Sequence, residues 1–242
     1  MTPSSPTLPA VRLDGLLRND DATMASWLER WSVSQTLRQT GIIVLGAGAF
    51  GAAMGSWRAP EQALWSGLKL PAVLLATTAG NVLINGMLAP LLGIRLNLHA
   101  ATAAVLTSFS LAALMLGAFS PVMLFLSWNL PPPDPTVPAT VAARSVMLLS
   151  LVGMIAVAGI TANVRLLGLI RRLAPDRATA LRLLFSWLAI NLLVGSQLSW
   201  IARPFIGKAT IPVCFLSPRA FEGSFFEELA RTAAELWTHF FP

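Results

Sequence analysis

The chain has 242 residues and a mass of 25.8 kDa, with 55% hydrophobic residues, only 12% charged residues and a mean hydropathy of +0.67. This composition excludes a soluble enzyme, a disulfide-rich scaffold and a disordered chain, because too few polar side chains are present to cover a water-exposed surface. The net charge is +6 and the pI is about 11.2. Because the Lys and Arg residues lie between apolar runs rather than in one basic patch, they indicate membrane flanks and no nucleic-acid partner. We therefore predict an all-α polytopic integral membrane bundle.

The N-terminal part precedes the first apolar run. Residues 1–21 are rich in Pro and Ser and predict a flexible tail. Over 22–39 the apolar side chains recur with helical spacing, which predicts an amphipathic helix at the membrane interface; they are Met24, Trp27, Leu28 and Trp31. The short basic region and adjoining apolar core of a signal peptide are not found before residue 41, so we expect the first span to be retained.

The first predicted span, near 41–57, is dense in small residues. Ala47, Gly51 and Gly55 recur every fourth residue and therefore share one helix face. Such a face lets another helix approach closely, because no side chain separates the two backbones. The partner helix is either within the chain or in a second copy.

The second predicted span, near 70–93, is unusually polar. Asn81 and Asn85 lie four residues apart, with Thr77 and Thr78 one turn earlier. These side chains either make hydrogen bonds between helices or form a polar track for an ion or solute. We expect the two Asn amides to pair with Asn191 or Gln197 of the last span, and Pro90 to bend or end the helix.

Three further spans are predicted near 99–119, 142–165 and 181–202, which makes the bundle extend over about 40–203. Pro121 is expected to break the third helix, leaving a short second piece that ends at Trp128. The sequence NLPPPDPTVP that follows predicts an extended connector. The loop between the last two spans is the strongest orientation signal, since it concentrates Arg171, Arg172, Arg177 and Arg182. It predicts a cytoplasmic N-terminus and an outer C-terminus.

Residues 204–242 predict an extramembrane loop followed by an amphipathic helix. Pro204, Pro212 and Pro218 prevent a further span. Ser224 and Glu227 have the spacing of a capping box, in which each side chain bonds the other residue's backbone amide. Apolar residues then recur on one face of the following stretch. Because its polar side is acidic, this helix is expected to dock on protein rather than on anionic lipid.

Catalytic chemistry is excluded by the positions of the reactive side chains. None of the eleven Asp and Glu residues falls inside a predicted span, which disfavours an ion-coupled transporter. His99 and His239 are far apart and have no Cys or carboxylate at ligand spacing, so no metal site and no cofactor are predicted. We expect a protein that is not an enzyme.

Several strings resemble a group of uncharacterised bacterial multi-pass membrane proteins. They are Gly67-Leu68-Lys69-Leu70-Pro71, the WNLPPP break, the run from Gly195 to Gly207 (GSQLSWIARPFIG), and Phe221-Glu222-Gly223-Ser224-Phe225-Phe226. The resemblance covers roughly residues 40–230. It implies a location in the bacterial inner membrane. The five-span plan is also similar to that of the Yip (Ypt-interacting protein) family, although the Asp-Leu-Tyr-Gly-Pro type string of that family is absent and the chain has no tyrosine.

Two functions of different classes fit these patterns. The first is a non-enzymatic scaffold or assembly subunit of a membrane complex, with the lipid bilayer and a protein as partners. The protein contact, or self-association, would use the small-residue first span or the C-terminal helix. The second is a passive channel or facilitator with a polar track between spans two and five, formed by Thr77, Asn81, Asn85, Asn191 and Gln197.

Overall fold

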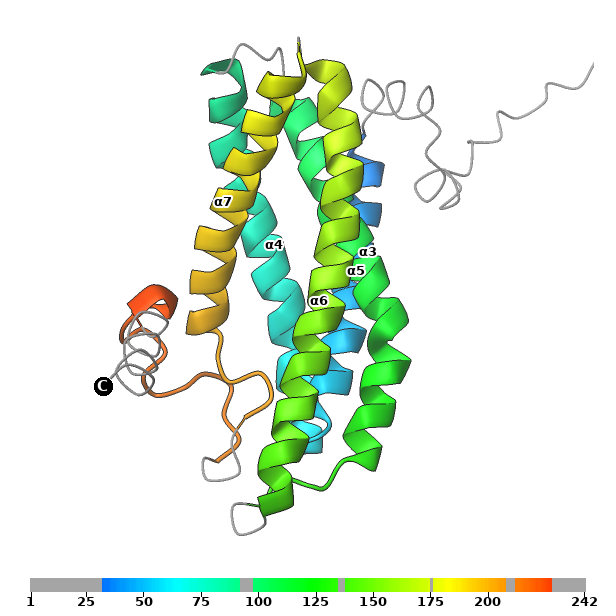
Figure 1. The fold of residues 1–242 in the computed structure, drawn as a ribbon, viewed down its shortest axis with the longest axis vertical. Coiled ribbons are helices and arrows are strands. Elements are labelled where there is room, and N and C mark those ends of the chain that lie inside the picture. Colours follow the sequence, from blue (N-terminus) through cyan, green and yellow to red (C-terminus); the bar gives the residue numbers. More distant parts are fainter. Residues whose placement is uncertain (1–31, 92–97, 135–137, 175, 208–211, 228–242) are drawn as a thin grey trace, which may run out of the picture.

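A computed structural model describes residues 32–91, 98–134, 138–174, 176–207 and 212–227. Its regular structure there is helical, which confirms the all-α prediction, and five helices are each long and apolar enough to cross a membrane. Their bounds are α3 Val33–Gly55, α4 Pro60–Leu91, α5 Leu98–Asn129, α6 Pro138–Leu173 and α7 Arg177–Ile201. Figure 1 shows them as one elongated bundle in which consecutive helices run in opposite directions. The predicted 1–21 tail and most of the predicted 22–39 helix lie outside the described residues.

The first helix starts earlier than the sequence predicts. A capping box fixes its start: the Ser32 backbone N–H donates to Gln35 Oε1 at 2.8 Å, and the Gln35 N–H donates to Ser32 Oγ at 3.4 Å. From Val33 the helix continues to Gly55 without a boundary near residue 40. A single glycine at position 41 lowers helix propensity by only about 1 kcal/mol, which is too little to end the helix by itself.

The small-residue face of α3 packs against α4. A Cβ atom added to Gly51 would overlap the Ser66 carbonyl oxygen, and one added to Gly55 would overlap the Gln62 carbonyl oxygen. Ala47 is fully buried on the same helix. These contacts are within the chain, so the Gly51 and Gly55 positions are already covered by a neighbouring helix.

A second close approach joins α3 to α5. A Cβ atom added to Gly117 would lie 3.0 Å from the Gly46 Cα atom, and one added to Gly46 would overlap the Ala113 carbonyl. Further along α5, the Ser127 hydroxyl donates to the Ala53 carbonyl of α3 at 2.9 Å. Small residues therefore let α3 lie between α4 and α5 at backbone contact distance.

The predicted break of the third helix at Pro121 does not occur, because α5 runs through it to Asn129. Proline removes one backbone hydrogen bond, a loss that packing on both sides can offset. Before Pro121 the helix is held by the Gly46–Gly117 contact, and after it by buried Met123 and Ser127. Tertiary contacts thus override the local signal.

The helices α4 and α6 are also longer than predicted. Proline at the first helical position suits an N-terminus, where its missing N–H has no intrahelical partner, and both helices begin with one, Pro60 and Pro138. Pro71 lies inside α4, which ends at Leu91 just after Pro90. The predicted span begins near residue 70, whereas α4 has ten further residues before that point, and some of their side chains form part of the site described below.

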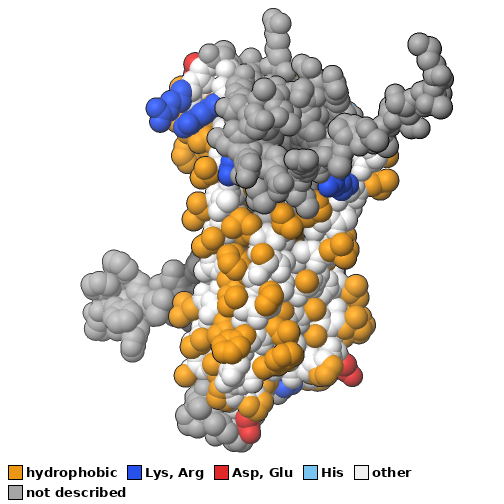
Figure 2. All heavy atoms as spheres, turned by 90° about the vertical axis from the view of Figure 1, so that its right-hand side faces the viewer, with side chains coloured by type: hydrophobic (Ala, Val, Ile, Leu, Met, Phe, Trp, Pro, Cys, Tyr) orange, Lys and Arg blue, Asp and Glu red, His pale blue; other side chains and the backbone are white. Residues whose placement is uncertain are grey.

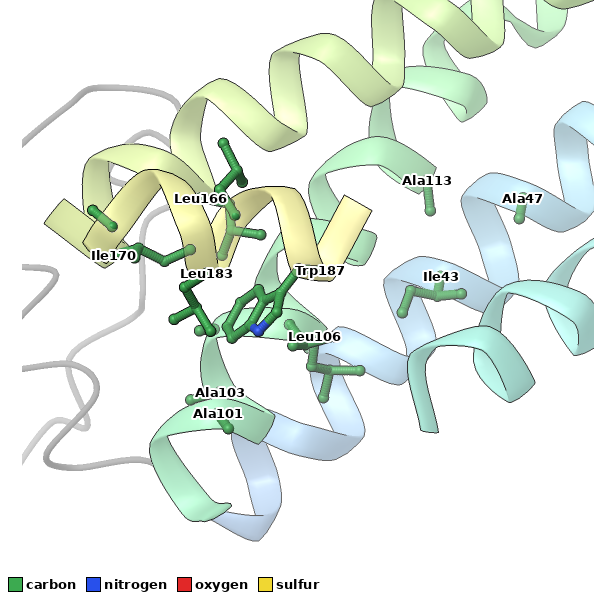
Figure 3. Packing of buried hydrophobic residues seen from close by; sticks show 14 residues of the cluster. Ile43, Ala47, Ala101, Ala103, Leu106, Ala113, Leu166, Ile170, Leu183 and Trp187 are labelled. Atoms are coloured by element: carbon green, nitrogen blue, oxygen red, sulfur yellow. The ribbon is translucent and has the colours of Figure 1, made fainter. Parts of the chain in front are cut away.

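Asp176 caps the last helix. Its Oδ1 atom accepts the Thr179 backbone N–H at 2.8 Å, and this bond holds the pKa of the Asp176 carboxyl below its usual range. Beyond the cap, Trp187 and Leu183 enter an apolar cluster with side chains from three other helices, α3, α5 and α6 (Figure 3). Among the partners shown there are Leu166, Ile170, Ala101, Ala103 and Leu106.

The surface of the bundle is apolar in its middle. Figure 2 shows hydrophobic side chains over the middle of one face, with Lys, Arg, Asp and Glu placed toward its two ends. Exposed large side chains occur along α6 and α7, among them Leu149, Val152, Ile160, Phe185, Leu192 and Leu193. Toward the C-terminus, the Ser224 and Glu227 capping box forms through two hydrogen bonds of 3.1 Å. Most of the helix predicted after it lies outside the described residues.

We expect Gly51→Ala to destabilise the bundle, because the new methyl group would meet the Ser66 backbone carbonyl, which cannot move aside alone. Overpacking of this kind costs roughly 1–3 kcal/mol, so the thermal midpoint in detergent should fall by several degrees. Gly41→Ala is the matched control, since an added Cβ there meets no atom within 4 Å. Equal midpoints for the two variants would contradict the close approach of α3 and α4.

Candidate functional site

The helix α4 buries a row of polar side chains along one face. These side chains are three or four residues apart, so they share one helix face, on which the apolar Val73 fills the middle position. The polar members of the row are Gln62, Ser66, Lys69, Thr77, Asn81 and Asn85. At the helical rise the row is about 35 Å long, similar to the hydrocarbon thickness of a bilayer. Buried polar groups need hydrogen-bond partners, and the two halves of the row find theirs in different places.

The first half of the row binds the backbone that follows α7. Lys69 Nζ donates to the Pro204 carbonyl at 2.8 Å, and Gln62 Nε2 donates to the Phe205 carbonyl at 2.8 Å and to Pro204 at 3.1 Å. The Ser66 hydroxyl also donates to the Phe205 carbonyl. We call Gln62, Ser66 and Lys69 the donor triad. It supplies donors to two carbonyl groups that no helix satisfies, since α7 ends at Ile201.

Aromatic and backbone contacts hold the same segment at further points. The Lys69 amine lies 5.3 Å from the centroid of the Phe215 ring, and Trp65 packs edge-to-face on that ring at 5.1 Å. The Ser217 backbone N–H donates to the Arg203 carbonyl at 3.1 Å. The 203–227 segment, of which 203–207 and 212–227 are described, is therefore fixed against α4 and against itself.

The asparagine N–H donors of the second half of the row bond within α4, which corrects the predicted pairing with the last span. Asn81 Nδ2 donates to the Thr77 carbonyl at 2.9 Å, and Asn85 Nδ2 donates to Asn81 Oδ1 at 3.0 Å. Residues four apart on a helix are close enough for such bonds. A buried amide does not have to reach another helix, because the preceding turn of its own helix offers a nearer acceptor.

The two polar residues of α7 lie apart from the asparagine pair. Gln197 Oε1 accepts the Phe225 backbone N–H at 3.3 Å, so it binds the C-terminal segment instead. The buried Asn191 Oδ1 atom has no hydrogen-bond partner within the described part of the chain, and neither has Asn85 Oδ1. The helices α4 and α7 do meet near Thr77, where an added Cβ on Gly195 would lie 3.5 Å from the threonine methyl group.

The donor triad is not among the site residues predicted from the sequence. The signal was present, because Gln62, Ser66 and Lys69 have the i, i+4, i+7 spacing of one helix face. It was overlooked because the span was placed from residue 70 onward, which made Lys69 a flanking charge. Its side chain is in fact buried, with only 2% exposed. Sequence alone also does not say which backbone carbonyls the triad would meet.

A cavity of about 490 Å³ adjoins the donor triad. It lies between the start of α4, the start of α6 and the segment after α7. Gln62 belongs to both the triad and the cavity wall. The other polar and charged lining residues are Arg58, Arg144, Arg203, Ser217, Cys214 and Trp200, and the apolar ones include Leu148, Leu151, Phe205, Ile206 and Val213.

Within the described ranges, no group of three His, Cys, Asp or Glu side chains could hold a metal ion. Comparison with known proteins adds no assignment: no protein-family model, no curated protein and no solved structure matches the chain. The resemblance over residues 40–230 therefore stays a prediction.

We expect Lys69→Met to loosen the 203–227 segment, because it removes one of the two donors to the Pro204 carbonyl while keeping a similar side-chain length. Cys214 is the chain's one cysteine and lies within this segment, so its alkylation rate reports local opening. The rate should rise roughly fivefold, the factor produced by a loss of about 1 kcal/mol in opening free energy. Leu68→Met is the control, since Leu68 is exposed on the same turn. Equal rates in the two variants would contradict the role of the triad.

Proposed function

We propose that the protein is integral to a bacterial inner membrane and crosses it with its five long helices. The helix lengths support this, since the shortest, α3, has 23 residues and about 20 suffice to span a bilayer core. The apolar middle of the surface, with charges placed toward the two ends, also supports it (Figure 2).

The proposed orientation places the connection between α6 and α7 in the cytoplasm. This connection and its flanks carry the arginine cluster at 171–182, and short positively charged loops stay on the cytoplasmic side. Helix α7 runs away from this connection in Figure 1, so the proposal assigns the segment that follows α7 to the outer side.

Sidedness of cysteine labelling tests this orientation. We expect an impermeant maleimide added to spheroplasts to label native Cys214, whereas Asp176→Cys in a Cys214→Ser chain should be labelled only after permeabilisation. Position 176 is exposed and Cys214 is partly exposed, so both are chemically accessible. Labelling of both positions from the same side would contradict five crossings.

Within the membrane, the protein acts as a non-enzymatic scaffold or assembly subunit. The observation that carries this proposal is the donor triad, because three buried polar side chains of a long apolar helix are used to fix an irregular backbone segment. Backbone carbonyls beyond the end of a helix need such donors when they are buried against another helix. A fixed segment with exposed apolar side chains is suited to binding a partner without an ordering cost.

The partner surface assigned by this proposal is the 203–227 segment. Phe221 is 81% exposed, and Phe215 and Leu216 are exposed beside it. Figure 1 shows residues 212–227 to the side of the bundle, next to the end of α7. The alternative surface from the sequence, the small-residue face of α3, is occupied by α4 at Gly51 and Gly55.

We expect Phe221→Ser to release the protein from its complex, because aromatic anchors supply much of the binding energy at protein interfaces. In native electrophoresis after mild detergent extraction, the wild type should migrate as an assembly larger than its 25.8 kDa chain, and the variant as a smaller species. Phe185→Ser on α7 is the matched control, since that ring is also well exposed. Loss of the assembly in both variants would indicate a nonspecific effect and contradict this surface.

The alternative function, a passive channel or facilitator, is favoured by one observation, the length of the polar row from Gln62 to Asn85. Against it, Asn81 and Asn85 are at most 1% exposed and bond within α4. A solute flux in proteoliposomes that Asn81→Leu with Asn85→Leu abolishes, without a change in thermal midpoint, would contradict the scaffold proposal and favour the channel.

A further inference from the structure

Three arginines from three different parts of the fold line the cavity beside the donor triad. Arg58 lies in the turn between α3 and α4, Arg144 lies near the start of α6, and Arg203 follows the end of α7. Tertiary structure alone brings them together, since they are far apart in sequence. Like charges gathered in this way repel each other unless an anion is placed among them.

Arg203 is held in position for such an anion. Its guanidinium carbon lies 3.7 Å from the centroid of the Trp200 ring, and two of its N–H groups donate to the Trp200 and Arg219 carbonyls at 2.8 Å. A guanidinium has five N–H groups, so three remain for another acceptor. A donor group whose orientation is already fixed loses little entropy when it binds a ligand.

The described part of the cavity wall is positively charged. Asp and Glu do not occur among the described lining residues. Glu222, which lies near in sequence, forms its ion pair at 3.6 Å with Arg219, outside the cavity wall. Arg144 is exposed and makes no ion pair or hydrogen bond with any described residue. Its guanidinium is thus accessible from the cavity mouth.

The rest of the wall is apolar. Leu148 and Leu151 of α6 face Phe205, Ile206 and Val213 of the segment after α7 across the cavity. The volume of about 490 Å³ lies within the range of small-molecule sites. Gly207 also lines the cavity and has φ +80°, a conformation that favours glycine. A Cβ atom added there would lie 3.6 Å from Cγ of Arg58.

We propose that this cavity binds a phosphate-bearing anion, with the arginines at the phosphate and the apolar wall at the carbon body of the ligand. Guanidinium groups match phosphate oxygens with paired N–H donors, and they recognise phosphate more specifically than a lysine does. The apolar wall fits the glycerol and first acyl carbons of an anionic phospholipid. A soluble phosphate is the other source of the same chemistry.

Thermal-shift titration of the full chain in an uncharged detergent separates these sources. The probes are short-chain phosphatidylglycerol, the phosphatidylcholine with the same chains, and inorganic phosphate. We expect phosphatidylglycerol to raise the thermal midpoint saturably and phosphatidylcholine to have a much weaker effect. Arg144→Gln should raise the apparent Kd for phosphatidylglycerol roughly tenfold, through loss of one charge-assisted contact. Because Arg144 is exposed, its ligand-free midpoint should be unchanged.

Arg219→Gln is the matched control, since it removes a positive charge at the same end of the bundle but outside the cavity. An equal effect of inorganic phosphate and phosphatidylglycerol, both weakened by Arg144→Gln, would keep the anion site and assign it to a soluble phosphate. Equal weakening by Arg144→Gln and Arg219→Gln, or no response to any anion, would overturn the site. None of these results depends on the partner surface at Phe221, so the two proposals fail separately.

Discussion

The close approach of α3 to α4 is the constraint on which the rest of the structure depends. Gly51 and Gly55 leave room for the Ser66 and Gln62 backbone carbonyls. The side chains of Ser66 and Gln62 in turn bind the backbone after α7. Without the glycines, α4 would lie farther from α3, and the donor triad would no longer lie beside the backbone that follows α7. One backbone contact therefore determines where the donor triad, the 203–227 segment and the arginine cavity lie.

The donor groups in the polar row of α4 find their hydrogen-bond acceptors in two physically different ways. Between Thr77 and Asn85 the acceptors belong to the preceding turn of the same helix, so this half adds little to tertiary specificity. Between Gln62 and Lys69 the acceptors belong to residues about 140 positions away, so this half specifies a long-range contact. Because an unpaired buried donor is costly, that contact defines the conformation of the segment after α7 and makes it suited to recognition.

Polar and charged groups are distributed unequally between the two ends of the bundle. At the end that carries the α6–α7 connection, arginines flank a helix start capped by Asp176. At the other end, arginines surround a cavity, and indole groups bond backbone carbonyls: Trp57 reaches Pro131 at 3.0 Å and Trp200 reaches Glu222 at 3.3 Å. The first arrangement is typical of an orientation signal, and the second of a binding site.

The sequence by itself determined the helical class, the five long apolar helices, the polar content of α4 and the capping box at Ser224, since these follow from composition and local spacing. Tertiary structure decided two other features. Helix α5 continues through Pro121 because α3 holds it on both sides, and Lys69 is buried on Pro204. The physical reason is that the spacing of residues along a helix fixes the face on which each side chain lies. The partner of that side chain depends instead on which backbone groups remain without a donor once distant helices have packed together.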